Sequence, residues 1–400
     1  MKKKVWVISE YYYPIVTSTG YYMTEIAESL AKKELDIHVI CTSAKYNETN
    51  DYRLNKNEIH NGVTIHRVLV GSIDKNNFVK RTFRLLISSI QLFIKILANV
   101  NKKDEVFVVT NPAFLLLFMP IIKSLKKVKY KLLVHDIFPE NLSAIGQISS
   151  SSLTYKFLKK LFDKAYSKAD VCISIGRDMT EIIKRKVENR SLITLIPNWA
   201  DNKDVFPLSK TDTSTCMALN KENKFIFQFA GNLGHAQGLD NILEAISLID
   251  NSNIHFLFIG GGAKYEIIKE FSNNRDNVSL LGFQDRSKQS DFLNACDVAI
   301  VTLSDGMYGL GVPSKSYNIM AAGKPILMVG EENSEIALCI KEYNLGWIIE
   351  PNNPIALKDT FIQIYNDRNN LSTIQHNARQ TAETVFAKDI ILNKYYQLFN

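Results

Sequence analysis

Ser314 and Lys315 are the two residues whose types and positions point most directly to chemistry. They fall in the first turn of a short helix that the sequence predicts between Pro313 and Gly323, because proline favours the first helical turn and glycine the position past the last. An apolar, strand-like run stands on each side of it. The free backbone N–H groups and the positive dipole end at such a helix start attract anions. The pattern therefore predicts a phosphate site, and an ordinary crossover helix with a surface lysine is the alternative.

Glycine-rich turns follow three other predicted strands in the second half of the chain. They are GNLG at 231–234, GGG at 260–262 and the turn at Gly282, which is followed by Phe283. Glycine allows a backbone to approach a ligand closely, and an aromatic ring can form an apolar wall beside a flat ligand. Tight turns and a core phenylalanine are the alternative interpretation, so both remain open at this point.

His135 and Asp136 form a second candidate site, in the first half of the chain. They end a predicted strand at 130–135, and Glu140 follows after a short loop. A carboxylate at a strand end can accept a proton from a substrate hydroxyl or orient a substrate. The alternative is an aspartate that caps a helix beside a buried histidine.

The composition of the chain is that of a globular protein with two domains. It has 400 residues, of which 46% are hydrophobic and 22% charged, and its formal charge is +7. Residues 1–200 hold 31 Lys+Arg against 18 Asp+Glu (+13), whereas residues 201–400 hold 17 against 23 (−6). The basic first half favours an anionic partner such as a lipid surface or a phosphate-bearing molecule, with a solvated lysine-rich surface as the alternative. No nucleic-acid-binding motif is present.

The cysteines and the N-terminal segment indicate in which cellular compartment the protein is expected. Five scattered cysteines without a CxxC pair predict buried free thiols, and support neither a zinc site nor a redox dithiol. The apolar run after the first lysines is too short for a signal peptide, and we expect no stretch of transmembrane length. A cytoplasmic protein is therefore expected.

Apolar strand-like runs alternate with helical patterns through both halves of the chain. This alternation predicts an α/β protein with two Rossmann-like domains, each a doubly wound parallel sheet, facing each other across a cleft. We place the domains at 1–204 and 205–385, because the polar segment 201–224 has no apolar period and is typical of a linker.

Several ordered stretches of the sequence resemble glycosyltransferase family 4. They are YYYPIVTSTGYYMTEIAESLAKK, VHDIFPENLSAIG, LIPNWAD, GNLGHAQGLDNILEAI, VPSKSYNIMAAGKPI and SEIALCIKEYNLGWII. The resemblance runs nearly end to end and is nearest to a bacterial branch that includes N-acetyl-L-fucosaminyltransferases of O-antigen and capsule assembly. It implies a GT-B fold with the acceptor on the first domain and the nucleotide sugar on the second. It also implies that a C-terminal helix, about 386–400, packs back on the first domain.

The resemblance assigns roles to residues of this chain. It implies that the donor is bound by Gly20, Gly231, Asn232, Gly234, Gly282, Phe283, Gly311, Ser314, Lys315, Asn318 and Glu335. It implies that the catalytic candidates are His135, Asp136 and Glu140. For Gly20, the alternative interpretation is that the glycine simply starts a helix.

The chain departs from the pattern of the family at four positions. The two usual glutamates, separated by seven residues, are Leu310 and Asn318 here, although Asn318 could still bond a ribose hydroxyl. The usual arginine and lysine of the glycine-rich loop are Asn232 and Gln237. Lys315 must therefore carry more of the charge of a donor diphosphate.

The implied activity is a retaining transfer that needs no metal and no cofactor. A sugar, expected to be an N-acetylated amino- or deoxy-sugar, would pass from a UDP-sugar to a polyprenyl-diphosphate-linked or other glycan acceptor. The chain has no Asp-x-Asp motif. The missing glutamates keep open a nucleotide-sugar-binding protein without transferase activity, and a two-domain sugar-nucleotide epimerase is a further alternative.

Two apolar segments adjoin basic residues in the first half. In 78–100 one apolar stripe is formed by Phe83, Leu86, Ile87, Ile90, Ile94 and Leu97, and Lys80, Arg81 and Arg84 stand at its start. The segment 113–125 runs into a lysine cluster at 123–131. A wide apolar face with a basic end is typical of a helix in a membrane interface, with a core helix as the alternative. We therefore expect peripheral association with anionic lipid at the inner face of the cell membrane.

Overall fold

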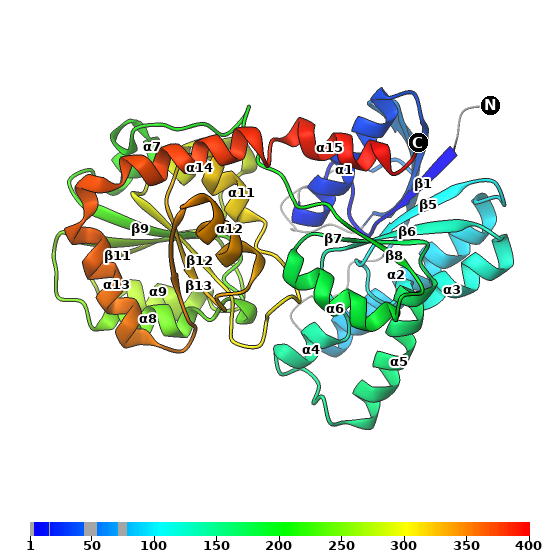
Figure 1. Ribbon diagram of the computed structural model, residues 1–400, viewed down its shortest axis with the longest axis horizontal. Helices are drawn as coiled ribbons and strands as arrows, with labels where there is room; N and C mark the ends of the chain where they lie inside the picture. The colour runs from blue at the N-terminus through cyan, green and yellow to red at the C-terminus, as the bar shows by residue number, and fades with distance from the viewer. Residues whose placement is uncertain (1–3, 16, 44–53, 71–77) are drawn as a thin grey trace. The chain divides into compact units, whose positions relative to one another are not determined.

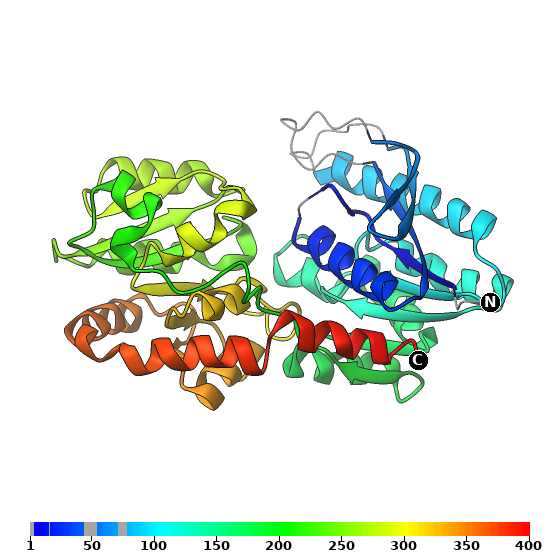
Figure 2. The ribbon, with the colours of Figure 1, turned by 90° about the horizontal axis from the view of Figure 1, so that it is seen from above.

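A computed structural model describes residues 4–15, 17–43, 54–70 and 78–400, without the side chains of 78–81. The chain forms two compact units (Figures 1 and 2): unit 1 is Met1–Ile196 with Leu392–Asn400, and unit 2 is Pro197–Ile391. The boundaries expected from the sequence, after residue 204 and after residue 385, therefore both fall inside unit 2. The contacts that hold these two segments on unit 2 are given below.

Unit 1 is built on an eight-stranded sheet of order β3-β4-β2-β1-β5-β6-β7-β8. Its strands are β1 (Lys4–Ile8), β2 (Asp36–Thr42), β3 (Asn57–His60), β4 (Val63–Val68), β5 (Glu105–Val109), β6 (Lys129–Val134), β7 (Val171–Ser174) and β8 (Leu192–Leu195). Neighbouring strands are parallel except for the pair β3–β4. The central strands are almost continuously buried, as expected for a parallel sheet covered on both faces.

Helices cover both faces of this sheet (Figure 1). They are α1 (Ser18–Lys32), α2 (Phe78–Asn99), α3 (Leu115–Lys126), α4 (Glu140–Ala144), α5 (Leu153–Lys168), α6 (Arg177–Val187) and the C-terminal α15 (Lys388–Gln397). Right-handed crossovers place α1 on one face and α2, α3, α5 and α6 on the other. The end of α15 joins the α1 face, where Tyr395 and Phe399 contact the Phe107 ring with centroids 6.1 and 5.8 Å apart.

Unit 2 contains a six-stranded, fully parallel sheet of order β11-β10-β9-β12-β13-β14. Its strands are β9 (Phe225–Ala230), β10 (Ile254–Ile259), β11 (Val278–Leu281), β12 (Val298–Thr302), β13 (Ile326–Val329) and β14 (Gly346–Ile349). Both units are thus doubly wound parallel sheets, which confirms the predicted fold class.

The helices of unit 2 form two layers (Figure 1). They are α7 (Ser214–Leu219), α8 (Leu239–Ser247), α9 (Tyr265–Asn273), α10 (Gln289–Asn294), α11 (Lys315–Ala321), α12 (Glu335–Tyr343), α13 (Pro354–Asn366) and α14 (Ser372–Thr384), with single turns η1 (Lys210–Asp212), η2 (His235–Gln237), η3 (Arg286–Lys288) and η4 (Arg368–Asn370). One apolar core joins the sheet to α8 and α13, around Phe227 and Phe361, and another joins it to α11, α12 and α14, around Tyr317.

The segment from 197 to 224 is part of unit 2, although the sequence suggested a linker. The guanidinium of Arg379 donates to the carbonyl oxygens of Val205 and Asn202 at 2.9 and 3.0 Å. Cys216 of α7 is fully buried in the unit 2 core. Side-chain bonds of this kind hold a segment without apolar periodicity, so the periodicity argument could not detect it. In the same core, Phe386 packs on Tyr317 at 5.0 Å, which keeps the segment before α15 on unit 2.

Two other expectations meet the structure directly. All five cysteines are buried and free, as predicted. The expectation that no stretch reaches transmembrane length is wrong. By length and composition alone, Thr82–Asn99 of α2 could cross a membrane.

Candidate functional site

The candidate site in unit 2 lies at the carboxyl ends of β9 and β12. The sheet runs from β9 through β10 to β11 in one direction and from β12 through β13 to β14 in the other. In open parallel sheets, ligands bind at such a switch point, outside the carboxyl ends of the strands. Gly231 directly follows β9, and the connection that leaves β12 reaches α11 at Lys315.

Three glycines let the ends of β9 and β10 pack backbone to backbone. Gly231, Gly260 and Gly262 have φ of +147°, +138° and +152°, which side chains rarely tolerate. A Cβ at Gly260 would stand 1.9 Å from the carbonyl oxygen of Gly231, and one at Gly262 would stand 2.6 Å from that of Leu233. The backbone of the GGG turn therefore packs directly against the backbone of the GNLG loop. This favours the interpretation of GGG as a tight turn.

The side chain of Lys315 lies against this loop. Its Nζ is 3.3 Å from the centroid of the Phe229 ring, and a Cβ at Gly231 would stand 3.6 Å from Nζ. Across the described ranges of the chain, no carboxylate pairs with Lys315. Burial without a counter-charge lowers the pKa of Lys315 to about 7. An anionic ligand beside Nζ would supply the missing charge.

Polar bonds hold the glycine-rich loop beside Lys315. The hydroxyls of Thr302 and Ser304, at the end of β12, donate to the carbonyl oxygens of Gln237 and His235 at 2.7 and 2.9 Å. After β13, burial raises the pKa of Glu331, while the backbone at residues 306 and 308, in the loop before α11, acts to lower it. The glycine-rich loop is therefore anchored to the end of β12.

Asn232 and Gln237, which replace two usual cations, shape the glycine-rich loop. The Oε1 of Gln237 accepts a hydrogen bond from the backbone N–H of Gly234 at 3.1 Å. A Cβ at Gly234 would come within 2.8 Å of the ends of both amide side chains, which would then have to shift. Asn232 is exposed and remains able to contact a ligand.

The other predicted donor residues of unit 2 lie along the same edge of the sheet. Gly311 and Ser314 are partly buried and flank Lys315 in the β12–α11 connection. Gly282 and the 66% exposed Phe283 follow β11, so this ring is not part of the core. Glu335 begins α12, is buried, and accepts a hydrogen bond from the Cys339 thiol at 3.4 Å.

Asn318 does not face a ligand, contrary to the expectation that it could bond a ribose hydroxyl. It is 6% exposed, and its Oδ1 accepts a hydrogen bond from the backbone N–H of Asp201 at 2.8 Å. Its Nδ2 donates to Gln289 Oε1 at 3.1 Å and to Asp201 Oδ2 at 3.4 Å. The amide is thus used to hold the segment after residue 196 against α11.

His135 and Asp136 lie at the carboxyl end of β6 in unit 1. The hydroxyl oxygen of Thr110 accepts hydrogen bonds from both backbone N–H groups, at 3.1 and 3.2 Å. Asp136 is exposed, and within the described residues its carboxylate has no hydrogen bond or ion pair. It does not cap a helix, since the N-cap of α4 is Pro139. Burial lowers the pKa of His135 to about 4, so its imidazole is neutral near pH 7.

Glu140 is not a free catalytic group, contrary to the prediction. Its carboxylate accepts hydrogen bonds from Lys186 Nζ at 2.7 Å and from Lys159 Nζ at 3.0 Å. Burial pushes the pKa of Glu140 up, but the two ammonium groups lower it on balance. A carboxylate that is paired and held ionised in this way stabilises the start of α4 and is a poor proton carrier.

Arg84 is buried, contrary to the prediction that it faces lipid headgroups. It is 6% exposed, and its Nη1 donates to Glu10 Oε1 at 2.7 Å. Glu10 follows β1, and its backbone N–H donates to Asn111 after β5, so this pair lies at the switch point of the unit 1 sheet. The side chains of Lys80 and Arg81 lie outside the described residues.

Gly20 is explained by packing within unit 1. A Cβ at this position would stand 2.6 Å from the carbonyl oxygen of Ile15. The backbone N–H of Gly20 donates to the Thr17 hydroxyl at 2.9 Å, which caps α1. These contacts support the alternative reading, a glycine at a helix start.

Comparison with known proteins identifies the family. The family described as "Glycosyl transferases group 1" matches residues 217–381. "Probable glycosyltransferase WbjE" of Pseudomonas aeruginosa is 37% identical over 357 residues, which cover 88% of this chain and 87% of that protein. The chain belongs to the group 1 glycosyltransferases. The enzyme is also 23% identical over 413 residues, 98% of each chain, to WcaI of Escherichia coli, described as a colanic acid biosynthesis glycosyl transferase.

A solved structure supports the GT-B fold of the glycosyltransferase. The Anabaena protein Alr3699/HepE, solved in complex with UDP, aligns with a TM-score of 0.75 at 14% identity over 99% of both chains. At this identity the likeness shows the fold alone. The prediction of a GT-B fold class with two doubly wound domains is confirmed.

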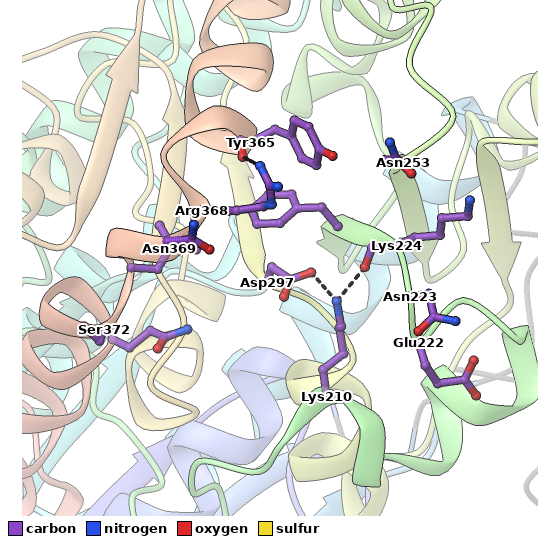
Figure 3. Close-up of a pocket in the computed structure, with 13 residues that line it drawn as sticks. Lys210, Glu222, Asn223, Lys224, Asn253, Asp297, Tyr365, Arg368, Asn369 and Ser372 are labelled. Atoms are coloured by element: carbon purple, nitrogen blue, oxygen red, sulfur yellow. Dashed lines mark hydrogen bonds and ion pairs between the residues drawn. The ribbon is translucent and has the colours of Figure 1, made fainter.

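A hollow in unit 2 lies at the amino ends of the strands, opposite the candidate site (Figure 3). It encloses about 500 Å³ and is lined by residues at the amino ends of β9, β10 and β12, among them Asp297. The Nζ of Lys210 donates there to Asp297 Oδ2 and to the carbonyl oxygen of Lys224, both at 2.6 Å (Figure 3). The ammonium of Lys210 is therefore already paired with a carboxylate of the protein, whereas that of Lys315 is not paired within the described residues. For this reason we do not place the donor in this hollow.

Sequence reasoning missed several residues that shape the site of the glycosyltransferase. The ring of Phe229 lies against the ammonium of Lys315, and Ser304 holds the glycine-rich loop. The only sequence signal for Phe229 was its place in an apolar strand. Over the described part of the chain, no cluster of three or more His, Cys, Asp or Glu residues is placed to hold a metal ion.

Proposed function

We propose that the enzyme is a retaining glycosyltransferase of bacterial surface-polysaccharide assembly. Its donor would be a UDP-sugar with an N-acetylated amino- or deoxy-sugar, and its acceptor a polyprenyl-diphosphate-linked or other glycan. The single observation that carries the donor class is Lys315, a partly buried ammonium at a switch point without a carboxylate partner among the described residues. The names of two similar proteins support a role in polysaccharide assembly and a uridine nucleotide donor. WcaI is described as a glycosyl transferase of colanic acid biosynthesis, and HepE was solved in complex with UDP.

Lys315 would bind the diphosphate of the donor. Departure of the nucleotide leaves negative charge on the β-phosphate, and an ammonium fixed beside it stabilises that charge more in the transition state than before it. Gly231 leaves open backbone next to Nζ, and the exposed Phe283 offers an apolar surface for the base. We propose that no metal and no cofactor takes part, since Lys315 supplies the positive charge.

Asp136 would act on the acceptor. Its exposed carboxylate can accept the proton of the attacking hydroxyl or orient that hydroxyl, and the neutral imidazole of His135 can hydrogen-bond the sugar. Retention of configuration is taken from the family resemblance, and no covalent nucleophile is assigned. The reaction would take place on the inner face of the cell membrane, where a lipid-linked acceptor is presented.

The test is transfer from a panel of UDP-sugars, with and without a lipid-linked acceptor, followed by mass spectrometry. We expect a glycosylated acceptor with one donor, and much less product from Lys315→Met. Lys269→Met is the matched control, because Lys269 is exposed and, within the described residues, its one ion pair is with Glu266 on its own helix. Conversion of a UDP-sugar into its epimer without acceptor would indicate an epimerase, and binding without any turnover would contradict the proposed transfer.

A further inference from the structure

Helix α2 exposes its apolar stripe instead of burying it. Phe83, Leu86, Ile90 and Ile94 are 57%, 39%, 40% and 60% exposed. They are spaced three or four residues apart, so they share one face of the helix. The opposite face, which packs on β2 and β4, carries Arg84, Ser88, Ser89, Leu92 and Ile96, all buried. The stripe is therefore an apolar surface and not a core face.

Two neighbouring helices extend this surface. Phe93 of α2 stacks on Phe118 of α3 at 4.9 Å, and α3 packs in turn on α5. Ile121 and Leu125 of α3 are 46% and 64% exposed, although most of the other residues of the predicted segment 113–125 are buried or half-buried. On α5, Leu153 and Phe157 are 83% and 64% exposed. The three helices cover the same face of the sheet (Figure 1), and we call their exposed apolar side chains the α2–α3–α5 surface.

Unpaired basic residues continue the surface on α5. Lys160 and Lys164 continue the three- and four-residue spacing of Leu153 and Phe157 along α5. Lys156 directly precedes Phe157. All three lysines are exposed, and within the described residues none of them forms an ion pair. An apolar helix face bordered by free ammonium groups is complementary to a bilayer with anionic headgroups.

The structure argues that α2 lies along a bilayer and does not cross it. The window Thr82–Asn99 is apolar enough to span, and only 28% of it is buried. Crossing would break the buried ion pair between Arg84 and Glu10 and would remove α2 from its contacts with β2 and β4. A helix that keeps these contacts can immerse only its outer stripe.

We propose that the α2–α3–α5 surface docks the enzyme on an anionic lipid bilayer. The proposal rests on the proposed function in one respect, since docking would bring unit 1 and Asp136 to a lipid-linked acceptor. A second copy of the chain is a less suitable occupant, because the free lysines would face one another across a symmetric interface.

The test uses flotation with vesicles of equal parts phosphatidylcholine and phosphatidylglycerol, and with vesicles of phosphatidylcholine alone. We expect binding to the anionic vesicles at low salt, and release by high salt. Ile90→Glu with Ile94→Glu should lower the bound fraction roughly tenfold or more, because charges would enter the interface. Ile355→Glu is the matched control, since Ile355 is 63% exposed on α13 of unit 2.

Three outcomes would overturn the docking proposal. They are no binding of the wild-type chain to anionic vesicles at low salt, unchanged binding of the double variant, and a double variant that loses only self-association in sedimentation. Thermal unfolding of the variant should match the wild type, because both isoleucines are exposed. A short-chain, water-soluble acceptor separates the two proposals: if docking fails, transfer to it persists, whereas failure of the proposed function abolishes transfer with vesicle binding intact.

Discussion

Both units have a buried or partly buried cation at the switch point of a parallel sheet, but the two cations differ in whether a carboxylate pairs with them. In unit 1 the cation Arg84 is paired with the buried carboxylate of Glu10. In unit 2 the ammonium of Lys315 rests on an aromatic ring and has no carboxylate partner within the described residues. The comparison teaches that a sheet reversal provides a place for a ligand, while the balance of charge at that place indicates what the ligand must bring.

Breaking the matched pair should have the largest effect. Arg84→Met removes the cation that pairs with the buried carboxylate of Glu10, and we expect a loss of roughly 3–5 kcal/mol in the unfolding free energy of unit 1. Urea unfolding followed by circular dichroism measures it. Arg190→Met is the control, because Arg190 pairs with Glu188 at the surface, where such pairs contribute little. A loss no greater than that of the control would show that the pair is not structural.

Removing the carboxylate of Asp136 should reduce turnover next. Asp136→Asn keeps the shape of the side chain but removes its ability to accept a proton, which we expect to slow transfer about hundredfold. The affinity for UDP should stay unchanged, because the donor site is assigned to unit 2. Steady-state kinetics with the lipid-linked acceptor, together with UDP titration, separate the two quantities. Full turnover in the variant would make Asp136 a structural residue.

Removing the unmatched cation should weaken donor binding without unfolding the chain. For Lys315→Met we expect a loss of about 1.5–3 kcal/mol in UDP binding, since one charge-assisted contact is removed. Stability should not fall, because a partly buried ammonium without a counter-charge does not favour folding. UDP titration and thermal unfolding of the same variant check both parts. A variant that binds UDP as the wild type does would remove Lys315 from the site.

Local patterns predicted the fold and the position of Lys315, but not its surroundings. Apolar runs and helix boundaries are read within about twenty residues, and they located the strands, α11 and the glycine-rich loops. The partner of Arg84 lies 74 residues away, and that of Asn318 lies 117 residues away. No local period carries such information, so both side chains were assigned to ligands when the protein itself uses them.

The orientation of α2 shows the same limit for surfaces. Its apolar face is wide, so the sequence identified the stripe but not which side of the helix faced the sheet. The structure decides this because Arg84, Ser88 and Ser89 are buried on the β2 and β4 side. The exposed stripe is thus the one that the sequence identified, whereas the exposed lysines described beside it, Lys156, Lys160 and Lys164, come from α5.

Proton uptake on donor binding is the most direct test of the unmatched cation. With a pKa of about 7, Lys315 is mostly neutral at about pH 8 in the free enzyme. A bound diphosphate favours the charged form and raises that pKa, so binding should take up a proton and weaken as the pH rises above 7. Calorimetric titration with UDP at about pH 8, in buffers of different ionisation enthalpy, measures the uptake. The account predicts uptake approaching one proton in the wild type and none in Lys315→Met; equal uptake in both, or none in the wild type, would contradict it.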